Sequence, residues 1–483
     1  EISECLVGSE MCIRDRLRDV FMKLKTRIYL LCSFLLVGCN QPKEKVETQM
    51  TEINNPILPG YFADPSLVQY EGKFYLYATV DPWGADFLPC WVSEDFRNWT
   101  FHRLNWPTKA ACTSALSHKN MVWAPSVIQK GDMFYMYVSV GSEVWCGKAA
   151  HPLGPWENAL GDKPMISFDT TRYYHVIDAE AFIDDDGKAY LYWGSGWGWT
   201  NGHCFGARLN DDMASFATEP VEVTPAHYFE APYMLKHNGK YYLTYSEGKT
   251  IDDTYKVCYA VGDHPLGTFE EAGNSPILTT NKELKVYGPG HHTLFTYDNK
   301  TYMLYHRHRW PFLNDGSAFR QTCLSELTFN DPENEINNIV PHHTQLFPDL
   351  NKDDRQFIQV DEILSSSERN KDFMAKNVLD GSYATRWEAT DGEEDSYLSA
   401  IFKDSAYIDT MEIRFEYPWK RYFIKVETAD DENNWVVVAD YTAEGIEGSP
   451  VHIPISKVCK SVKISFLNKA GAAKPSVWEL LFY

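Results

Sequence analysis

Five segments of the chain share one pattern of apolar and polar positions. In each, a turn-forming group is followed by a run in which aromatic and aliphatic residues alternate with other residues. The segments are YEGKFYLYATV (70–80), KGDMFYMYVSV (130–140), DDDGKAYLYWG (184–194), HNGKYYLTYSE (237–247) and YDNKTYMLYHR (297–307). Alternation with a period of two predicts half-buried strands, and the turns predict hairpins.

The spacing of these segments predicts how the strands assemble. Their equivalent tyrosines lie 60, 55, 52 and 60 residues apart: Tyr75, Tyr135, Tyr190, Tyr242 and Tyr302. A unit of about 50 to 60 residues suits one four-stranded propeller blade. Independent β-domains are the alternative, but units this short could hardly bury cores of their own. We therefore expect a five-bladed β-propeller over residues 54–345.

The pattern changes after residue 345. Residues 346–360 are expected to form a linker, and shorter alternating runs follow in residues 361–483, for example SAYIDTMEIRFEY and KSVKISFLN. Runs of this kind predict a β-sandwich. The expected fold class is therefore all-β, with a propeller followed by a sandwich.

The N-terminal segment carries a targeting signal. Residues 1–21 resemble a translated artefact, so the natural start is expected at Met22. Residues 22–38 have a basic beginning and an apolar centre, which are typical of a signal peptide. The LVGC ending resembles a bacterial lipobox, with a lipid on Cys39 and a linker over 39–53; an ordinary secretory signal is the alternative. We expect an exported lipoprotein, periplasmic or anchored in the outer membrane, whose only membrane contact is that lipid.

Composition and charge narrow the choice of partners. The formal net charge is −22 and the isoelectric point is near 5.1. Long-range attraction to phosphates needs the opposite sign, so nucleic acid and anionic membrane surfaces are poor partners, and neutral substrates fit better. Seven cysteines follow Cys39 without CxxC pairs or metal-ligand spacing, so cysteine chemistry is not the expected function, and the sequence does not choose among disulfide pairings.

Polar residues recur at one phase of the repeat. Eleven or twelve residues before the equivalent tyrosines stand Asp64, Trp123, Asp178, Glu230 and His291. Equivalent positions of propeller blades converge around the central channel. Three carboxyl groups gathered there repel one another, so at least one should have a raised pKa. A protonated and an ionised carboxyl group facing each other are the apparatus of glycosidic bond cleavage.

The residues by themselves do not assign the roles of the three carboxyl groups. They do not say which group is the acid and which the base. Glu180 lies two residues beyond Asp178, so it would face the same side of a strand and could replace Asp178 in its role.

These motifs, taken together and in order, resemble glycoside hydrolase family 43. The matching stretches are NPILPGYFADPS, WAPSV, ID before DDDGKAYLYWG, FEAPYMLKHNGKYYLTYS and GPGHHTLF, within residues 54–345. The resemblance implies an inverting enzyme that releases terminal arabinose or xylose from plant or algal glycans, an α-L-arabinofuranosidase or a β-xylosidase. A β-galactosidase, β-galactofuranosidase or arabinanase of the same fold is an alternative, and a non-catalytic glycan-binding lipoprotein is the rival from another class.

The resemblance also implies roles for individual residues. Asp64 would be the general base, Glu230 the general acid, and Asp178 the group that tunes and orients the acid. His291 would help to hold a central calcium ion or a water molecule. The candidate substrate-binding residues are Phe62, Trp123, His291 and Arg320. The sequence departs from the family pattern after Asp178, where Ala179 and Glu180 stand in place of the usual proline.

The C-terminal segment has a resemblance of its own. AKNVLDGSYATRW (375–387) and SVWELLFY (476–483) are similar to discoidin-like, coagulation factor type C modules, a group that includes family 32 carbohydrate-binding modules. The resemblance implies a jelly-roll sandwich, possible glycan binding, and a structural calcium ion at Asp380, Thr385 and Glu479. No organic cofactor is expected.

Overall fold

The computed structural model of the chain describes residues 49–169, 171–350, 353, 355–390 and 395–483. Within these residues there are thirty strands and one short 3-10 helix, which confirms the all-β prediction. No helix among them is long and apolar enough to cross a bilayer. The predicted leader, signal peptide and lipidated Cys39 lie outside the described residues.

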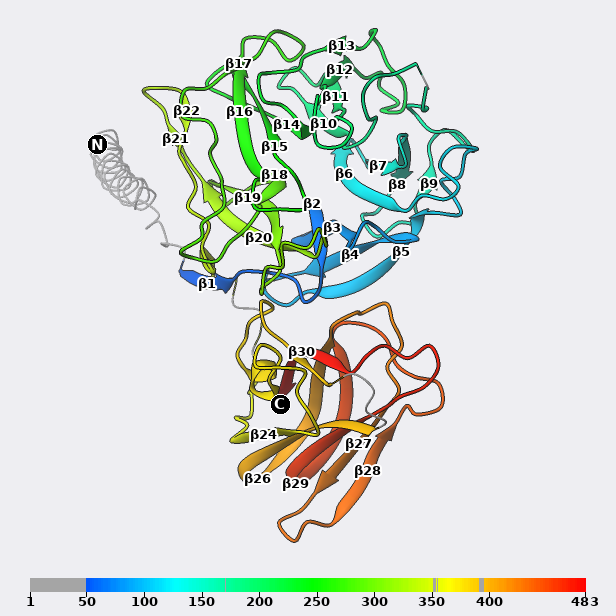
Figure 1. Cartoon of the computed structure of the whole chain (residues 1–483), viewed down its shortest axis with the longest axis vertical. Coiled ribbons are helices and arrows are strands. Elements are labelled where there is room, and N and C mark those ends of the chain that lie inside the picture. Colours follow the sequence, from blue (N-terminus) through cyan, green and yellow to red (C-terminus); the bar gives the residue numbers. More distant parts are fainter. Residues whose placement is uncertain (1–48, 170, 351–352, 354, 391–394) are drawn as a thin grey trace, which may run out of the picture. The chain divides into compact units, whose positions relative to one another are not determined.

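Five sheets follow one another along the chain as propeller blades (Figure 1). The first four blades each have four described strands. The first blade contains β2 (Phe62–Tyr70), β3 (Lys73–Val80), β4 (Phe87–Ser93) and β5 (Thr100–Thr108), and the second contains β6 (Val122–Lys130), β7 (Met133–Val140), β8 (Val144–Ala149) and β9 (Glu157–Asn158). The third contains β10 (Glu180–Ile183), β11 (Ala189–Trp193), β12 (Phe205–Arg208) and β13 (Val221–Glu222), and the fourth contains β14 (Glu230–His237), β15 (Lys240–Glu247), β16 (Lys256–Gly262) and β17 (Glu270–Glu271). The fifth has three described strands, β18 (Gly290–Tyr297), β19 (Lys300–His308) and β20 (Arg320–Leu327), and the small pair β21 (Phe329–Asn330) and β22 (Glu335–Ile336) follows it. The five-bladed prediction is confirmed.

The beginning of the propeller is bonded to its end. Strand β1 (Met50–Asn54) pairs with β23 (Thr344–Pro348). Next to it, the Asn55 side chain donates to the carbonyl of Leu324 and accepts from the Leu324 amide, both at 2.8 Å. The ring of blades is thus closed by residues far apart in the sequence. Strand β1 begins within the segment 39–53, and β23 extends into 346–360, the two segments for which a linker is expected.

Buried tyrosines tie successive blades together. The phenol groups of Tyr77, Tyr137 and Tyr192 donate to the carbonyl oxygens of Pro152, Met213 and Pro265 at 2.6 to 2.7 Å. A buried phenol needs such an acceptor, while its ring fills the space between two sheets. This explains why the repeated strands contain tyrosine where a simpler core would use leucine.

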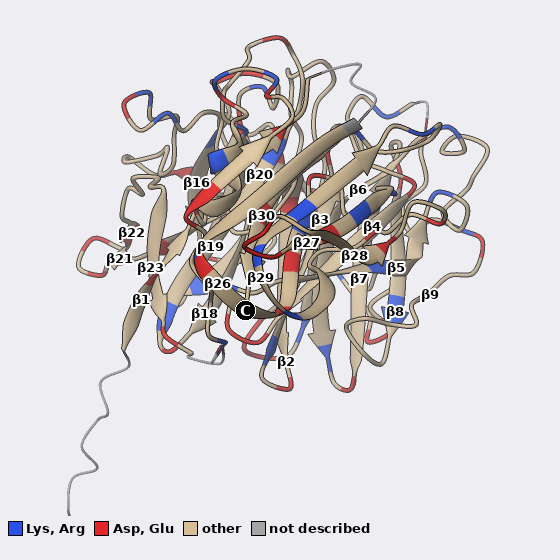
Figure 2. Cartoon of the chain, turned by 90° about the horizontal axis from the view of Figure 1, so that it is seen from below, with Lys and Arg blue, Asp and Glu red and all other residues tan. Residues whose placement is uncertain are grey.

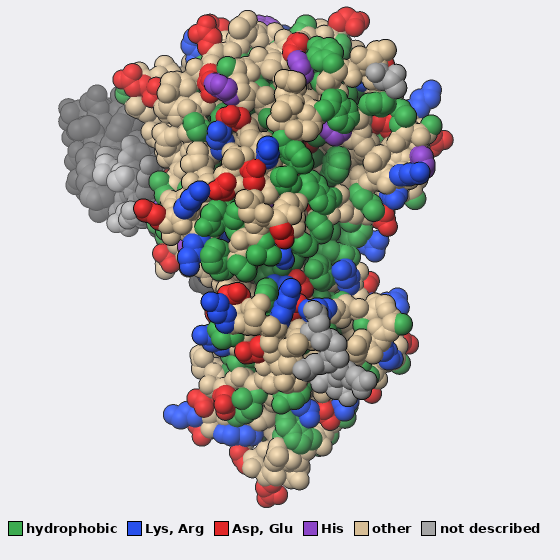
Figure 3. All heavy atoms as spheres, viewed as in Figure 1, with side chains coloured by type: hydrophobic (Ala, Val, Ile, Leu, Met, Phe, Trp, Pro, Cys, Tyr) green, Lys and Arg blue, Asp and Glu red, His purple; other side chains and the backbone are tan. Residues whose placement is uncertain are grey.

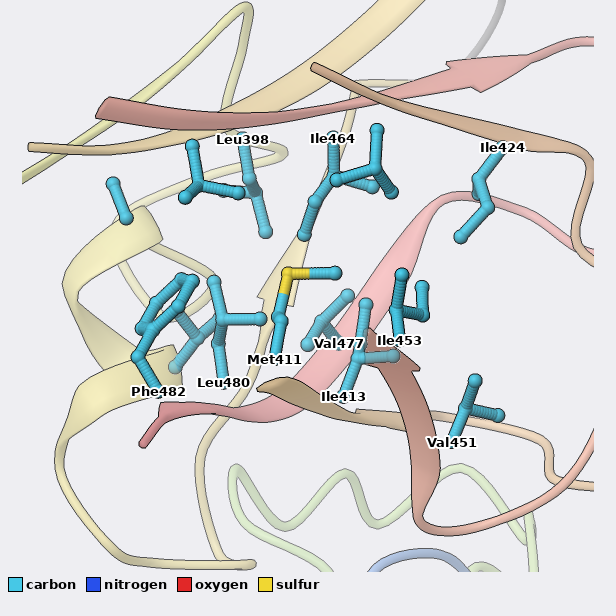
Figure 4. Close-up of a cluster of buried hydrophobic side chains, with 14 of the residues drawn as sticks. Leu398, Met411, Ile413, Ile424, Val451, Ile453, Ile464, Val477, Leu480 and Phe482 are labelled. Atoms are coloured by element: carbon cyan, nitrogen blue, oxygen red, sulfur yellow. The ribbon is translucent and has the colours of Figure 1, made fainter. Parts of the chain in front are cut away.

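The C-terminal residues form a β-sandwich, as predicted. Its elements are β24 (Glu362–Ser365), the 3-10 helix η1 (Ala375–Leu379), β25 (Trp387–Glu388), β26 (Asp395–Phe415), β27 (Ile424–Ala429), β28 (Trp435–Asp440), β29 (Val451–Leu467) and β30 (Ser476–Phe482). The first part of β26 pairs with β24 and its last part with β30, so this long strand contributes to both layers. Leu398 and Ile464 face Met411, Ile413 and Leu480 in the core between them (Figure 4). The discoidin-like classification stays a prediction.

The surface mixes both signs of charge. Acidic and basic residues are interspersed over the loops and strands seen in Figure 2. In the space-filling view hydrophobic side chains gather on part of the visible face, with charged side chains scattered around them (Figure 3). Contiguous exposed apolar surface is typical of binding faces.

Candidate active site

Each blade begins with an irregular backbone position that re-aims a side chain. Positive φ angles occur at Asp64 (50°), Ala124 (49°), Asp178 (57°), Ala231 (55°) and His291 (41°). In β2, β6, β14 and β18 the strand register shifts at the same place, as in a β-bulge. Non-glycine residues adopt this conformation only where the surroundings compensate for its cost.

The predicted site residues do not all occupy the same place in this bulge. Asp64, Asp178 and His291 are themselves the positive-φ residues, whereas Trp123 and Glu230 each come one residue earlier. All five nevertheless line one cavity of about 260 Å³, together with Arg320. Counting back from the equivalent tyrosines located each of the five residues to within one position of the bulge. It could not distinguish the bulged residue from the residue before it.

Aromatic side chains wall the cavity, and they differ from those expected. Trp123 lines it as predicted, and so do four aromatic residues that the sequence did not single out: Trp83, Trp197, Trp199 and Phe229. Trp83 and Trp197 are 43% and 47% exposed, which places them at the solvent side of the wall.

The prediction for Phe62 is wrong. Its side chain is fully buried and packs edge-on against Trp91 and Trp419, with ring centroids 5.1 and 5.8 Å apart. Phe62 lies two residues before the bulged Asp64, where the strand still directs this side chain into the core of the first blade. It therefore does not contact the cavity.

Asp64 is surrounded by donors and positive charge. Its Oδ2 accepts a hydrogen bond from Thr79 Oγ1 at 2.7 Å, and its Oδ1 accepts one from Arg320 Nη1 at 2.9 Å. His291 Nδ1 lies 3.2 Å from Oδ1. Burial alone would raise the pKa of Asp64, but Arg320, His291 and His306 outweigh it and hold the pKa well below its ordinary value. Asp64 is therefore the ionised carboxylate of the cavity.

Arg320 is held by a second buried acid that the sequence did not reveal. Its Nε and Nη2 donate to the two carboxylate oxygens of Asp81, each at 2.8 Å, and its backbone N–H donates to Asp81 Oδ2 at 2.8 Å. A two-pronged contact of this kind fixes the plane of the guanidinium. Asp81 comes directly before Pro82 at the end of β3, so its sequence reads as an ordinary turn.

Glu230 has only neutral partners. Tyr255 donates to Oε1 at 2.8 Å and Ser195 donates to Oε2 at 3.0 Å. Burial raises the pKa of Glu230 to about 7, against the lowering effect of these two hydroxyl groups. Near neutral pH this side chain can therefore carry a proton and deliver it.

Both other carboxyl groups of the cavity affect the pKa of Asp178. Its pKa is raised well above the ordinary value, first by burial and then by the negative charges of Glu230 and Asp64. Glu180 does not line the cavity; its side chain bonds with Ser126, and burial raises its pKa to about 8. Of the two acids between which the sequence left a choice, only Asp178 lines the cavity, and the charge of Glu230 raises its pKa.

A hydrogen bond that recurs between neighbouring blades holds Asp178 in the cavity. A side chain on the second strand of one blade accepts the N–H of the bulged residue in the next blade. The pairs are Thr79 with Ala124 (2.8 Å), Ser139 with Asp178 (3.0 Å), Ser246 with His291 (2.9 Å) and His306 with Asp64 (3.3 Å).

The third blade breaks this series. Its equivalent residue is Gly194, where a Cβ would lie 2.2 Å from the carbonyl oxygen of His203, so no side chain fits. The N–H of Ala231 is bonded by the Asp178 carboxyl group instead. Asp178 therefore holds the backbone directly beside Glu230. Its role in tuning the pKa of the acid stays a prediction.

Residues 53–333 match the family described as glycosyl hydrolases family 43, which is more than half of the chain. The chain belongs to glycosyl hydrolase family 43. This family 43 protein is thus an O-glycosyl hydrolase of the inverting type.

Known proteins of the family resemble the chain over different lengths. It is 33% identical to a beta-D-galactofuranosidase of Aspergillus niger over 302 residues, 59% of this chain and 84% of that protein. It is 28% identical to a xylosidase/arabinosidase of Bacteroides ovatus, over 52% and 87% of the two chains. A solved structure titled glycoside hydrolase superposes with a TM-score of 0.75 at 26% identity, covering 89% of this chain and 99% of that one. That likeness extends beyond the propeller into the sandwich.

The metal predictions for this family 43 hydrolase concern two places. In the propeller, His291 Nδ1 lies 3.2 Å from Asp64 and 3.8 Å from Asp178. Among the described residues no group of three or more His, Cys, Asp and Glu side chains is arranged as a metal site. A metal-binding role of His291 stays a prediction.

In the sandwich, the predicted calcium ligands lie close together. Thr385 Oγ1 donates to Asp380 Oδ2 at 2.6 Å, and the Ser382 N–H lies within hydrogen-bond distance of both Asp380 and Glu479. Burial raises the pKa of both carboxyl groups, and the charge of Asp380 raises that of Glu479 further. Oxygen donors alone, with two acids side by side, fit a hard cation such as calcium. This site also stays a prediction.

Proposed function

We propose that this family 43 hydrolase removes a single terminal α-L-arabinofuranose, or in second place a β-xylose, from plant or algal glycans. The observation that carries the proposal is the pairing of an ionised Asp64 with a protonated Glu230 in one aromatic-walled cavity. Sugar rings stack their apolar faces on aromatic side chains, and their hydroxyl groups require polar partners.

The site supports a single displacement. Asp64, held ionised by Arg320, takes a proton from a water molecule as that water attacks the anomeric carbon. Glu230 gives its proton to the leaving oxygen, so the glycosidic bond breaks as the new bond forms. Burial and the negative charge of Asp64 keep the proton on Glu230 until that moment, and Asp178 orients the acid through its contact with the Ala231 N–H.

The cavity size favours removal of one terminal sugar. Its volume of about 260 Å³ lies just below the roughly 300 Å³ at which pockets for drug-sized ligands begin. A space of that size supports one or two sugar rings and argues against a long open cleft. Exo action is therefore the expected mode.

A β-D-galactofuranosidase is the second candidate, favoured by the 33% identity to the Aspergillus niger protein. β-D-galactofuranose has the same ring configuration as α-L-arabinofuranose and carries one additional CHOH unit on its exocyclic carbon. A cavity that accepts one ring therefore accepts the other wherever its wall leaves room for that unit.

Sugar release from a panel of nitrophenyl glycosides tests the proposal. The panel contains the α-L-arabinofuranoside, β-D-xyloside, β-D-galactofuranoside and β-D-galactoside. Glu230→Gln should abolish release, whereas Glu180→Gln, a matched change of a partly buried acid outside the cavity, should keep it. Silence of the folded wild type on the panel and on natural oligosaccharides would overturn the proposal in favour of a non-catalytic glycan-binding protein.

The stereochemical course gives a second test. Proton NMR at early times should show the product sugar first as the anomer opposite to that of the substrate. First appearance of the retained anomer would contradict the single displacement.

Export and anchoring are proposed on the sequence alone. Labelling of the expressed protein with a radioactive fatty acid should mark the wild type and leave Cys39→Ser unlabelled. Equal labelling of both proteins would refute the anchor.

A further inference from the structure

The outer face of one sandwich layer carries a hollow that the catalytic chemistry does not use. It has a volume of about 470 Å³ and is formed by β24, β26 and β29 together with residues at the start of β28. Tyr397 and Trp435 contribute aromatic rings to it and are 36% and 37% exposed. We call this hollow the sheet-face hollow.

The strand pattern directs these side chains outward. Tyr397 pairs with Ser465, and Ser399 pairs with Lys463, on the neighbouring strands β26 and β29. The alternate residues of both strands, such as Leu398 and Ile464, enter the core. The outward rows therefore add nothing to the packing between the layers, and their composition requires another explanation.

The polar groups of the hollow are neutral or compensated. The Lys463 ammonium group lies 4.2 Å from the ring centroid of Trp435 and 3.3 Å from Glu427, a carboxylate that it shares with Lys425, so its charge is partly compensated. Hydroxyl groups of Ser399, Ser461 and Ser465 line the hollow between the two aromatic residues. Aromatic faces beside hydroxyl donors and acceptors suit a sugar, and a lining whose polar residues are mostly serines favours an uncharged ligand.

The separation of the two aromatic residues indicates the length of the ligand. Tyr397 on β26 and Trp435 on β28 are three strands apart in the order β26, β29, β27, β28. Across the sheet, Trp435 pairs with Ala429, Ala429 with Ser461, and Ser461 with Ile401. Ile401 lies four residues from Tyr397 along β26. Strand spacings of about 4.8 Å and a rise of about 3.3 Å per residue then place the two Cα atoms roughly 19 Å apart. Such a span favours a chain of several sugars over a single one.

We propose that the sheet-face hollow binds an uncharged glycan chain, at a site separate from the catalytic cavity. The proposal rests on the proposed function only for the class of ligand. A second attachment point holds the enzyme on a polymer and raises the local concentration of its chain ends. The hollow should therefore matter for polysaccharides and be irrelevant for small glycosides.

Affinity electrophoresis of the full chain in native gels tests this site. The gels contain soluble arabinoxylan, arabinan or galactan, and the protein carries Glu230→Gln so that the polymer is not consumed. At least one polysaccharide should retard this parent protein, and Trp435→Ala should weaken the retardation at least about tenfold. Tyr397→Ala, on another strand, should weaken it too, so that a folding defect in one variant does not decide the result.

The matched control is Tyr407→Ala. Tyr407 is a more exposed tyrosine (56%) on the same strand β26, outside the hollow, and its removal should leave retardation unchanged. In the active enzyme, Trp435→Ala should keep the rate on nitrophenyl glycosides and lower it on the retarding polymer. This separates failure of the hollow from failure of the proposed catalytic function.

Three outcomes would overturn the proposal. The first is equal retardation of the parent and both hollow variants, and the second is no retardation of the parent by any of the three polymers. The third is a parent that elutes as a dimer in size-exclusion chromatography and becomes a monomer on Trp435→Ala with retardation unchanged, since a second copy would then cover the face.

Discussion

The two sides of the catalytic cavity use the same kind of side chain and reach opposite protonation states. Both Asp64 and Glu230 are buried, and burial raises the pKa of each. Asp64 meets the Arg320 guanidinium, whereas Glu230 meets only the hydroxyl groups of Tyr255 and Ser195. The comparison teaches that the charge of the partner, not the depth of burial, decides which carboxyl group is ionised.

The largest expected effect is on kcat, and the leaving group of the substrate should distinguish the Asp64 variant from the Glu230 variant. Asp64→Asn and Glu230→Gln should each lower kcat on a sugar substrate by about 10²- to 10⁴-fold. A dinitrophenyl leaving group needs no proton, so with that substrate Glu230→Gln should recover much of its activity and Asp64→Asn should not. Steady-state kinetics on the two substrates provide the measurement, and equal recovery of both variants would contradict the assigned roles.

A smaller effect is expected from a change of Asp81, which holds Arg320 beside Asp64. Asp81→Asn removes one of the two carboxylates that the buried Arg320 contacts and leaves it with Asp64, so the free energy of unfolding should fall by up to about 3 to 5 kcal/mol, the cost of breaking a buried ion pair. The kcat should fall as well, because the guanidinium that faces Asp64 loses its fixed plane. Urea unfolding measures the stability, and Asp263→Asn, which alters an exposed ion pair with Lys240, is the control expected to show no change. A fully stable Asp81→Asn with normal kcat would show that Arg320 is held without it.

The smallest expected effect is a shift of the pH profile. If Glu230 is the acid, activity needs it protonated, so kcat/KM should fall as the pH rises through about 7, while the acidic limb set by Asp64 should lie well below the ordinary range of an aspartate. The hydrogen bond from Tyr255 lowers the pKa of Glu230, so Tyr255→Phe should raise that pKa and move the alkaline limb to higher pH.

Tyr245→Phe is the matched control for that shift. Tyr245 is a buried tyrosine whose phenol donates to the carbonyl of Ala226, not to Glu230. Its pH profile should match that of the wild type. A downward movement of the alkaline limb in Tyr255→Phe would identify a different group as the acid.

The repeat made much of this arrangement predictable. Five equivalent tyrosines gave the blades, and counting back from them located Asp64, Asp178 and Glu230, because every blade places the same sequence position at the same height. Phe62 was misassigned because alternation says nothing about where a bulge begins, and the bulge at Asp64 leaves the preceding aromatic side chain in the core.

The partners of the carboxyl groups were beyond the reach of the sequence. Asp81 reads as a turn residue, and its partner Arg320 lies 239 residues away. Tyr255 lies outside the five repeated segments, so no pattern marks it as a donor to Glu230. Contacts of this kind depend on which blades become neighbours, which a local pattern does not contain.

The proposed base, Asp64, has partners from both ends of the propeller. Asp64 belongs to the first blade and Arg320 to the fifth, 256 residues later, and the N–H of Asp64 bonds to His306 of that same fifth blade. A nascent chain that has folded its first four blades therefore has its acid in place but lacks the guanidinium that keeps the base ionised. The surroundings of the proposed base are therefore complete only once the last blade docks on the first.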